Sequence, residues 1–260
     1  MGDCLEALRQ IDLLKDQFLS ILMHELRTPL NYVTGFGSLL QDEASGSLNP
    51  VQQGHLERIL AGAEALERLV DDLLDMGQIQ AGRFKVHPEP GSVAEVVLDV
   101  VTGLAPVADA RGIELVNRVG ADSPDAHFDR VRVGQVLGNL VGNALKFTPE
   151  GGHVEIRARE EGDFLLCEVF DDGPAIPPEA RDKVFDRFAQ LDRASTRRVS
   201  GVGLGLAICK AIVEAHGGRI GVAGDNEAGT TLWFTLPLAA PAVAKASPGS
   251  GRPAASCPRG

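Results

Sequence analysis

The sequence is poor in several features that would mark other classes of protein. Its four cysteines (Cys4, Cys167, Cys209 and Cys257) form no C-x-x-C pair, which argues against a disulfide scaffold or a zinc site of that type. Aromatic residues make up only 5%, and 25 Lys+Arg against 36 Asp+Glu leave a net charge of −11. Few aromatic side chains are available to stack on bases, and the negative net charge would repel phosphates. Both observations argue against nucleic acid as a partner.

No stretch of about 18 apolar residues could span a bilayer, and the N-terminus lacks the basic and apolar regions of a signal peptide. We therefore expect a reduced, cytoplasmic protein with no membrane insertion. The remaining composition is that of a globular chain, with 44% hydrophobic and 23% charged residues. A length of 260 residues allows one large or two small domains.

The first part of the chain carries two apolar stripes at helical spacing. Residues 5–44 form the first stripe, and a second helix follows the turn at residues 45–50. Two long helices joined by a short loop make an antiparallel hairpin, which cannot enclose its own apolar stripes. We therefore expect a homodimer that forms a four-helix bundle. A monomer would leave four leucines of the apolar stripes in water, namely Leu26, Leu30, Leu66 and Leu73.

The second part alternates strand and helix patterns. We expect strands at residues 83–86, 113–119, 154–158, 165–169, 219–223 and 230–236, and helices at 92–110, 130–147 and 204–216. Ser92 is the predicted N-cap of its helix, with Glu95 at the spacing of a capping box. Hairpin strands mixed with helices predict a two-layer α+β sandwich with the helices on one face of the sheet.

One cluster of chemical interest lies on the first predicted helix. His24-Glu25 begins like an H-E-x-x-H zinc motif, but position 28 is Thr, so the second metal ligand is missing. A carboxylate beside a histidine can hold one ring nitrogen as N–H and leave the other as a nucleophile. Thr28 follows one turn later on the same face, and Pro29 should bend the helix there. For a lone histidine, the alternative is an ordinary helix-surface residue.

A second cluster consists of Asn139, Asn143 and Lys146, which share one stripe of a predicted helix. Asparagine is a mediocre helix former, so a purely solvated face would more often carry Glu, Lys or Gln. Amide oxygens and an ammonium suit a hydrated Mg²⁺ and a polyphosphate. An ordinary wet helix face remains the alternative.

The third and fourth clusters are Asp171-Asp172-Gly173, after a strand, and the glycine run Gly201, Gly203 and Gly205, which opens a helix. Either could be a simple turn. Glycines at a helix N-terminus present free N–H groups to an anion. The run is neither a dinucleotide fingerprint nor a Walker A loop.

In sequence and order, these four clusters resemble the H, N, G1 and G2 boxes of sensor histidine kinases. Residues 184–188 fit the intervening F box, and Gly229-Thr230-Thr231 fits the last glycine box. The resemblance covers residues 10–238. It implies a dimerisation and histidine-phosphotransfer domain at 1–84 and an ATP-binding domain at 85–239. The second domain is expected to have the Bergerat-type fold shared with gyrase, the Hsp90 chaperones and MutL. Residues 240–260 would be a disordered tail.

The resemblance also implies roles for individual residues. His24 would be the phosphoacceptor and Glu25 its orienting base, while Thr28 would position water for dephosphorylation of a partner. Asn143 would bind Mg²⁺ and Asp171 the adenine amino group. The remaining residues expected to bind ATP are Asn139, Lys146, Gly173, Arg197, Arg198, Gly201, Gly203, Gly205 and Thr230.

The expected activity is ATP-dependent autophosphorylation of His24 followed by transfer to an aspartate of a separate response regulator receiver domain. With no sensor domain in the sequence, the signal would come from a separate sensor protein or from a region missing from this chain. The alternatives are a pseudokinase scaffold with weak nucleotide binding and an ATPase clamp like gyrase or MutL.

Three positions depart from the family pattern. Met23 stands where Ser is usual, Gln190 where many relatives carry arginine, and Ala175 where the G1 box has its second glycine. If the backbone at Ala175 needs a positive φ, alanine is strained there. We therefore expect Ala175→Gly to tighten ATP binding by up to about tenfold.

Overall fold

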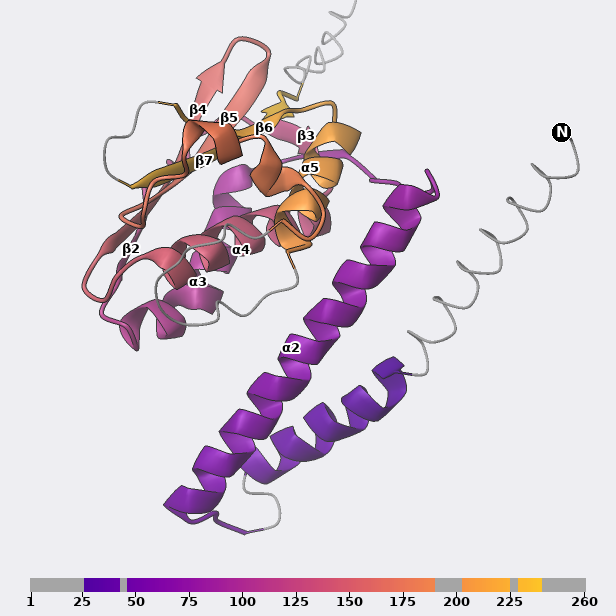
Figure 1. Cartoon of the computed structure of the whole chain (residues 1–260), viewed down its shortest axis with the longest axis vertical. Coiled ribbons are helices and arrows are strands. Elements are labelled where there is room, and N and C mark those ends of the chain that lie inside the picture. Colours follow the sequence, from indigo (N-terminus) through magenta and orange to yellow (C-terminus); the bar gives the residue numbers. More distant parts are fainter. Residues whose placement is uncertain (1–25, 43–45, 190–202, 225–228, 240–260) are drawn as a thin grey trace, which may run out of the picture.

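The structure is a computed structural model that describes residues 26–42, 46–189, 203–224 and 229–239. Its first part is the expected pair of helices, formed by residues 26–41 and α2 (Pro50–Gln80). The pair extends away from the sheets, and the C-terminal end of α2 lies beside the second part (Figure 1). Asn49 caps α2 through a capping box with Gln52, in which each side chain bonds the other residue's backbone N–H at 3.0 Å. Pro50 is the first residue of α2, a position that does not need a backbone N–H.

The hairpin closes only one narrow apolar seam within the chain. Leu30, Ala63 and Val70 are buried there, with Leu74 packed against them. Leu30 is only 7% exposed, so the prediction that a monomer would leave it in water is wrong. Leu56 is buried as well. The exposed apolar positions of the described stripes are Leu26, Val33, Leu40, Val51, Ile59, Leu66, Leu69 and Leu73.

The connection that follows α2 is irregular over residues 83–88, so the strand predicted at 83–86 is wrong. The backbone N–H groups of Arg83 and Phe84 bond the Gln78 carbonyl at 2.9 and 3.2 Å, which wraps the chain around the end of α2. Phe84 packs against the core of the second part. Its apolar character therefore reflects tertiary packing rather than a β ladder.

The described residues of the second part form two sheets and three α-helices. Its elements are β1 (Glu89–Gly91), α3 (Val93–Asp109), β2 (Glu114–Asn117), β3 (Ala126–Phe128), α4 (Arg130–Phe147), β4 (His153–Glu161), β5 (Phe164–Asp171), α5 (Gly205–Ala215), β6 (Ile220–Val222) and β7 (Thr230–Pro237), with short 3-10 turns η1 (Pro178–Ala180) and η2 (Lys183–Phe185).

The larger sheet has the strand order β2-β4-β5-β7-β6. All its neighbours are antiparallel except β2 and β4, which pair in parallel. The strands β1 and β3 form a separate antiparallel pair. The mixed sheet and its helices form the predicted two-layer sandwich (Figure 1). The sequence did not predict β3, which is only three residues long.

The core lies between the large sheet and helices α3, α4 and α5. Alternate residues of β5 and β7 face it, and the largest fully buried side chains include Phe234, Leu137 and Ile208. Met76, near the end of α2, belongs to the same apolar cluster, so the hairpin and the sandwich are packed together there. Ser92 is the N-cap of α3 as predicted, but its side chain makes no cap bond, and Glu95 pairs with Arg130 instead.

Candidate nucleotide site

The asparagine stripe lies on α4, as the spacing predicts. Asn139 and Asn143 are half-buried, and Lys146 is exposed in the last turn. Desolvation by the surrounding chain lowers the pKa of the Lys146 ammonium. The stripe therefore passes from buried amides to a cation at the surface.

Asn139 faces the beginning of α5. A Cβ added to Gly205, the first residue of α5, would lie 3.6 Å from the Asn139 amide. The Nδ2 atom of Asn139 is buried without a hydrogen-bond partner among the described residues. Since burial raises the pKa of the neighbouring Cys209 thiol, that group stays neutral. The same thiol also interacts with the Asn139 side chain, which offsets part of this rise. An amide beside a helix N-terminus fits a polar ligand such as a phosphate group.

Gly203 lies just before α5 in a conformation that requires glycine. Its φ is +74°, and an added Cβ would lie 2.8 Å from the carbonyl oxygen of Ala189. Its own carbonyl accepts a 2.9 Å bond from the N–H of Phe188, the one non-glycine residue with positive φ in the described part of the chain. The glycine run thus brings the F box against the start of α5.

Asp171 ends β5 and is only 5% exposed. Its Oδ1 accepts a 2.8 Å bond from the N–H of Gly173. A Cβ at Gly173 would lie 2.3 Å from that oxygen and 3.2 Å from the carbonyl oxygen of Phe147, at the end of α4. Only glycine fits at position 173, because the backbone there lies close to both Asp171 and Phe147. This close contact joins the loop after Asp171 to α4, the helix that carries Asn139 and Asn143.

Thr230 pairs with Asp171 across β5 and β7. It is buried, and its hydroxyl donates a 3.1 Å bond to the carbonyl of Pro174. Gly229, with φ +84°, leaves no room for a Cβ beside the Asp171 carbonyl oxygen. In the structure, Thr230 thus holds the loop after Asp171.

Ala175 lies in that loop and is exposed. Among the described residues, Phe188 is the only non-glycine residue with positive φ, so Ala175 does not adopt the conformation that favours glycine. The strain considered from the sequence is therefore absent, and the expected tenfold gain in Ala175→Gly loses its basis.

The structure brings together Asn139 with Gly205, and Asp171 with Gly173 and Thr230, with the end of α4 linking the two groups. Thr28 is exposed within the helical residues 26–41. The remaining predicted site residues, and two of the three departures, lie outside the described residues: His24, Glu25, Arg197, Arg198, Gly201, Met23 and Gln190.

Within the part of the chain that the structure describes, no group of three or more His, Cys, Asp or Glu side chains could hold a metal ion. A cation bound here would rely on amide and phosphate oxygens, which are ligands that Mg²⁺ accepts. Asn143, on the same face as Asn139, supplies such an amide. The donor set therefore fits a nucleotide that carries its metal.

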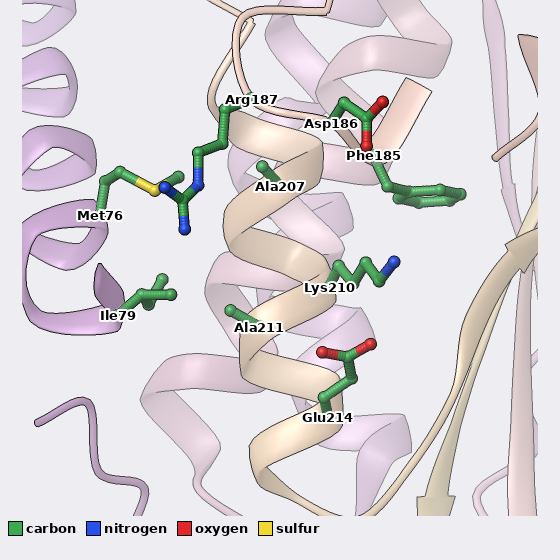
Figure 2. A pocket seen from close by; sticks show the side chains of 9 residues that line it. All are labelled: Met76, Ile79, Phe185, Asp186, Arg187, Ala207, Lys210, Ala211 and Glu214. Carbon is green, nitrogen blue, oxygen red and sulfur yellow. The ribbon is translucent and has the colours of Figure 1, made fainter. Parts of the chain in front are cut away.

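A separate cavity of about 360 Å³ lies between α2 and α5 (Figure 2). Met76 and Ile79 approach it from α2, and Ala207, Lys210, Ala211 and Glu214 from α5, with Phe185, Asp186 and Arg187 above. None of the predicted ATP-binding residues lines it. It marks the groove between hairpin and sandwich.

Sequence reasoning missed the polar junction at the start of α4. Asp129 caps this helix: its Oδ1 accepts from the N–H groups of Val131 and Arg132 at 3.1 and 3.2 Å, and its Oδ2 from that of His87 at 3.1 Å. Burial raises the pKa of Asp129, but these donors outweigh it and hold the pKa below its ordinary value. The sequence did contain a signal for this helix cap, because Asp129 stands directly before the helical pattern and Asp is a preferred N-cap residue.

His216, at the end of α5, completes this junction. Its Nε2 accepts a 2.9 Å bond from the backbone N–H of Asp129, and its Nδ1 lies 2.7 Å from the Ile212 carbonyl. The first bond requires a bare Nε2, so the ring is neutral with its proton on Nδ1. No local pattern predicts a contact across 87 residues.

A helical hairpin followed by a mixed-sheet sandwich with a polar site between α4 and α5 defines a two-part protein. Its second part resembles known ATPases: residues 128–240 match the model of the histidine kinase-, DNA gyrase B- and HSP90-like ATPases. Residues 14–82 match the His Kinase A phospho-acceptor domain. The chain belongs to the sensor histidine kinases.

Known relatives agree with this assignment. An uncharacterized sensor-like histidine kinase of Rhizobium meliloti is 36% identical over 232 residues, which cover 89% of this chain and 44% of that protein. The sensory/regulatory protein RpfC of Xanthomonas campestris pv. campestris is 38% identical, over 86% of this chain and 31% of RpfC. Full-length ShkA, solved in complex with AMPPNP, superposes with a TM-score of 0.68 at 32% identity, over 86% of this chain and 46% of ShkA. The chain thus spans less than half the length of these relatives.

No helix among the described residues combines the length and the apolar character needed to cross a membrane.

Proposed function

We propose that this chain is an ATP-dependent protein-histidine autokinase that phosphorylates His24 and passes the phosphoryl group to an aspartate of a separate response regulator. The observation that carries the proposal is the presence, in one chain, of a phospho-acceptor region followed by an ATPase region. Neither region alone would perform both steps. We assign the phosphotransfer domain to residues 1–84, the ATP-binding domain to 85–239 and a tail to 240–260.

The proposed roles follow the geometry of the site. Asp171 would accept a hydrogen bond from the adenine amino group, and a hydrogen bond from the Gly173 N–H already orients its carboxylate. The start of α5 would bind phosphate, and Lys146, Arg197 and Arg198 would contribute positive charge. Mg²⁺, held by Asn143, would neutralise charge on the phosphates when bound. Because ATP is the phosphoryl donor, we place the reaction in the cytoplasm.

We also propose that the working unit is a homodimer. Leu66 is 43% exposed and Leu73 37% exposed on α2, and Leu26 is 37% exposed on the facing helix. A patch of leucines left in water by one chain is typical of a surface that a second copy covers. A four-helix bundle would bury them.

Thr28 would serve the reverse reaction, removal of phosphate from the response regulator. It lies one turn after His24 in the sequence and is exposed on its helix. Thr28→Ala should keep autophosphorylation and lose the phosphatase step, whereas Glu25→Ala should slow autophosphorylation because the imidazole loses its orienting partner. Equal loss of both activities in Thr28→Ala would contradict this division.

The central experiment is incubation of the protein with γ-labelled ATP and Mg²⁺. Label that is labile to acid and stable to alkali is expected on the wild type and absent from His24→Gln, while both proteins bind a fluorescent ATP analogue equally. An unlabelled wild type at high protein and ATP concentrations would favour the pseudokinase scaffold. That alternative rests on Ala175, whose backbone does not require glycine.

A further inference from the structure

The contact between hairpin and sandwich contains a buried carboxylate. Asp75, near the end of α2, is 5% exposed. Nη1 of Arg132 donates to both of its oxygens, at 2.9 and 2.7 Å, and Nε2 of Gln135 donates to Oδ2 at 2.8 Å. The same Nη1 also lies 3.0 Å from Oε1 of Gln135. We call this closed set (Asp75, Arg132 and Gln135) the interdomain clasp.

The connecting segment packs on the clasp as well. The Arg132 guanidinium lies 4.9 Å from the centre of the Phe84 ring, a cation–π arrangement. The backbone N–H of Phe84 bonds the Gln78 carbonyl on α2 at 3.2 Å. The clasp thus fixes α2, the connection and α4 to one another.

Gln135 shares a face of α4 with the asparagine stripe. Gln135, Asn139 and Asn143 follow one another at intervals of four residues, so the two asparagines lie about 6 and about 12 Å from the clasp along one helix. A helix of this length transmits a rotation or shift at one end to the other. The position of α2 therefore sets the position of the nucleotide residues.

The same face of α2 also contacts the helix formed by residues 26–41. Asp71, one turn before Asp75, forms an ion pair with Arg27, which follows His24 by three residues in the sequence. Both members of this pair are about half exposed, at 49% and 55%. Consecutive turns of α2 thus contact the helix of residues 26–41 through Asp71 and the sandwich through Asp75.

We propose that Asp75 is a positioning residue: through Arg132 and Gln135 it holds the ATP-binding domain at the place on α2 from which bound nucleotide reaches His24. This inference rests on the proposed autokinase function. An ion pair with a buried carboxylate gives little net stability, but it specifies one arrangement, because any position of the domain that separates Arg132 from Asp75 leaves the carboxylate buried and uncompensated. That property suits a device that sets the register between two domains.

The test compares three variants of the full chain. Asp75→Asn removes the charge without changing the shape, and Arg132→Lys keeps the charge but loses the planar fork. Arg130→Gln is the matched control, because Arg130 lies two residues away on α4 and its ion pairs within the described part of the chain are with the exposed Glu95 and Asp99 of α3. Each protein is assayed for the affinity of a fluorescent ATP analogue and for the rate constant of autophosphorylation at saturating ATP.

We expect Asp75→Asn to lower the rate constant at least tenfold while the dissociation constant changes less than twofold. Arg132→Lys should retain an intermediate rate, and Arg130→Gln should match the wild type. An unchanged or faster rate in Asp75→Asn would overturn the proposal. So would a loss that is matched by weaker nucleotide binding, because it would indicate damage to the ATP-binding domain itself.

A second measurement does not depend on kinase activity. Arg83 and Lys85 lie in the irregular connection beside the clasp, and trypsin cleaves after both residue types. Cleavage there should be at least tenfold faster in Asp75→Asn than in Arg130→Gln. If the wild type takes up no label, the autokinase proposal fails while this rate still tests the clasp. Equal cleavage rates in the two variants would overturn the clasp.

Discussion

Asp72 lies on α2 between Asp71 and Asp75, where three carboxyl groups share two turns of one helix. Burial, followed by the charges of Asp75 and Asp71, raises the pKa of Asp72 to about 6, and Arg68 offsets only part of this. Ionised Asp72 therefore costs folding free energy at neutral pH. We predict that Asp72→Asn stabilises the protein.

The magnitude follows from the shift. The change from 3.8 to about 6 corresponds to about 3 kcal/mol between the two protonation states. Asp72 is only half-buried, so solvent screening reduces the expected gain to about 1 kcal/mol. A raised pKa means that the native state binds more protons than the unfolded chain. The free energy of unfolding of the wild type therefore falls as pH rises from about 4 to about 6, because Asp72 loses its proton over this range. The stabilisation by Asp72→Asn should reach its full value above that range.

The assay is urea denaturation followed by circular dichroism, at about pH 8 and about pH 4.5. The gain should be largest at the higher pH and fall to about a third of that value at the lower. Glu64→Gln is the control, since Glu64 is an exposed residue of α2 whose ion pair with Arg68 spans 3.8 Å. An equal effect of Asp72→Asn at both pH values, or a loss of stability at pH 8, would refute the reasoning.

Three further predictions concern other parts of the molecule. Leu66→Glu should dissociate the dimer in sedimentation while ATP binding by residues 85–239 persists, and a wild type that is monomeric at micromolar concentration would contradict the bundle. Ala175→Gly should change nucleotide affinity less than twofold in a titration, because no strained φ is relieved; a tenfold gain would contradict the backbone conformation. His216→Phe should lower the free energy of unfolding by about 1–3 kcal/mol, since the backbone N–H of Asp129 loses its acceptor. The control His127→Gln, at an exposed position, should leave the free energy of unfolding unchanged when unfolding is followed by the fluorescence of the single tryptophan.

The helices and most strands could be predicted because each carries its own periodic signal. The stripe at Val51, Leu56 and Ala63 and the asparagine spacing on α4 are local patterns, and both predicted helices are confirmed. The strand predicted at 83–86 is wrong because the apolar Phe84 packs against the sandwich and beneath Arg132. Two apolar residues, Phe84 and Val86, in a four-residue segment cannot distinguish these two uses.

The polar contacts between distant segments had no local signal. Asp75 stands in an acidic stretch of α2 that reads as a solvated face, yet its partners lie 57 and 60 residues away. The same holds for His216, which appears in the sequence only as the residue before a pair of glycines. Such positions are recognised by burial, which a single sequence does not report.

The residue types along one face of α4 follow from where each position lies. Asn139 faces α5 beside the neutral Cys209 thiol, and a carboxylate or ammonium at this position would be desolvated without a counterion. An amide supplies polar atoms there without net charge. Beyond the two asparagines, the first charged residue on this face is Lys146, where the helix reaches the surface. At the opposite end, Gln135 donates a hydrogen bond to Asp75 in its pair with Arg132 and adds no third charge. Mediocre helix formers are therefore tolerated on this face because ionised side chains would cost more than the lost helix propensity.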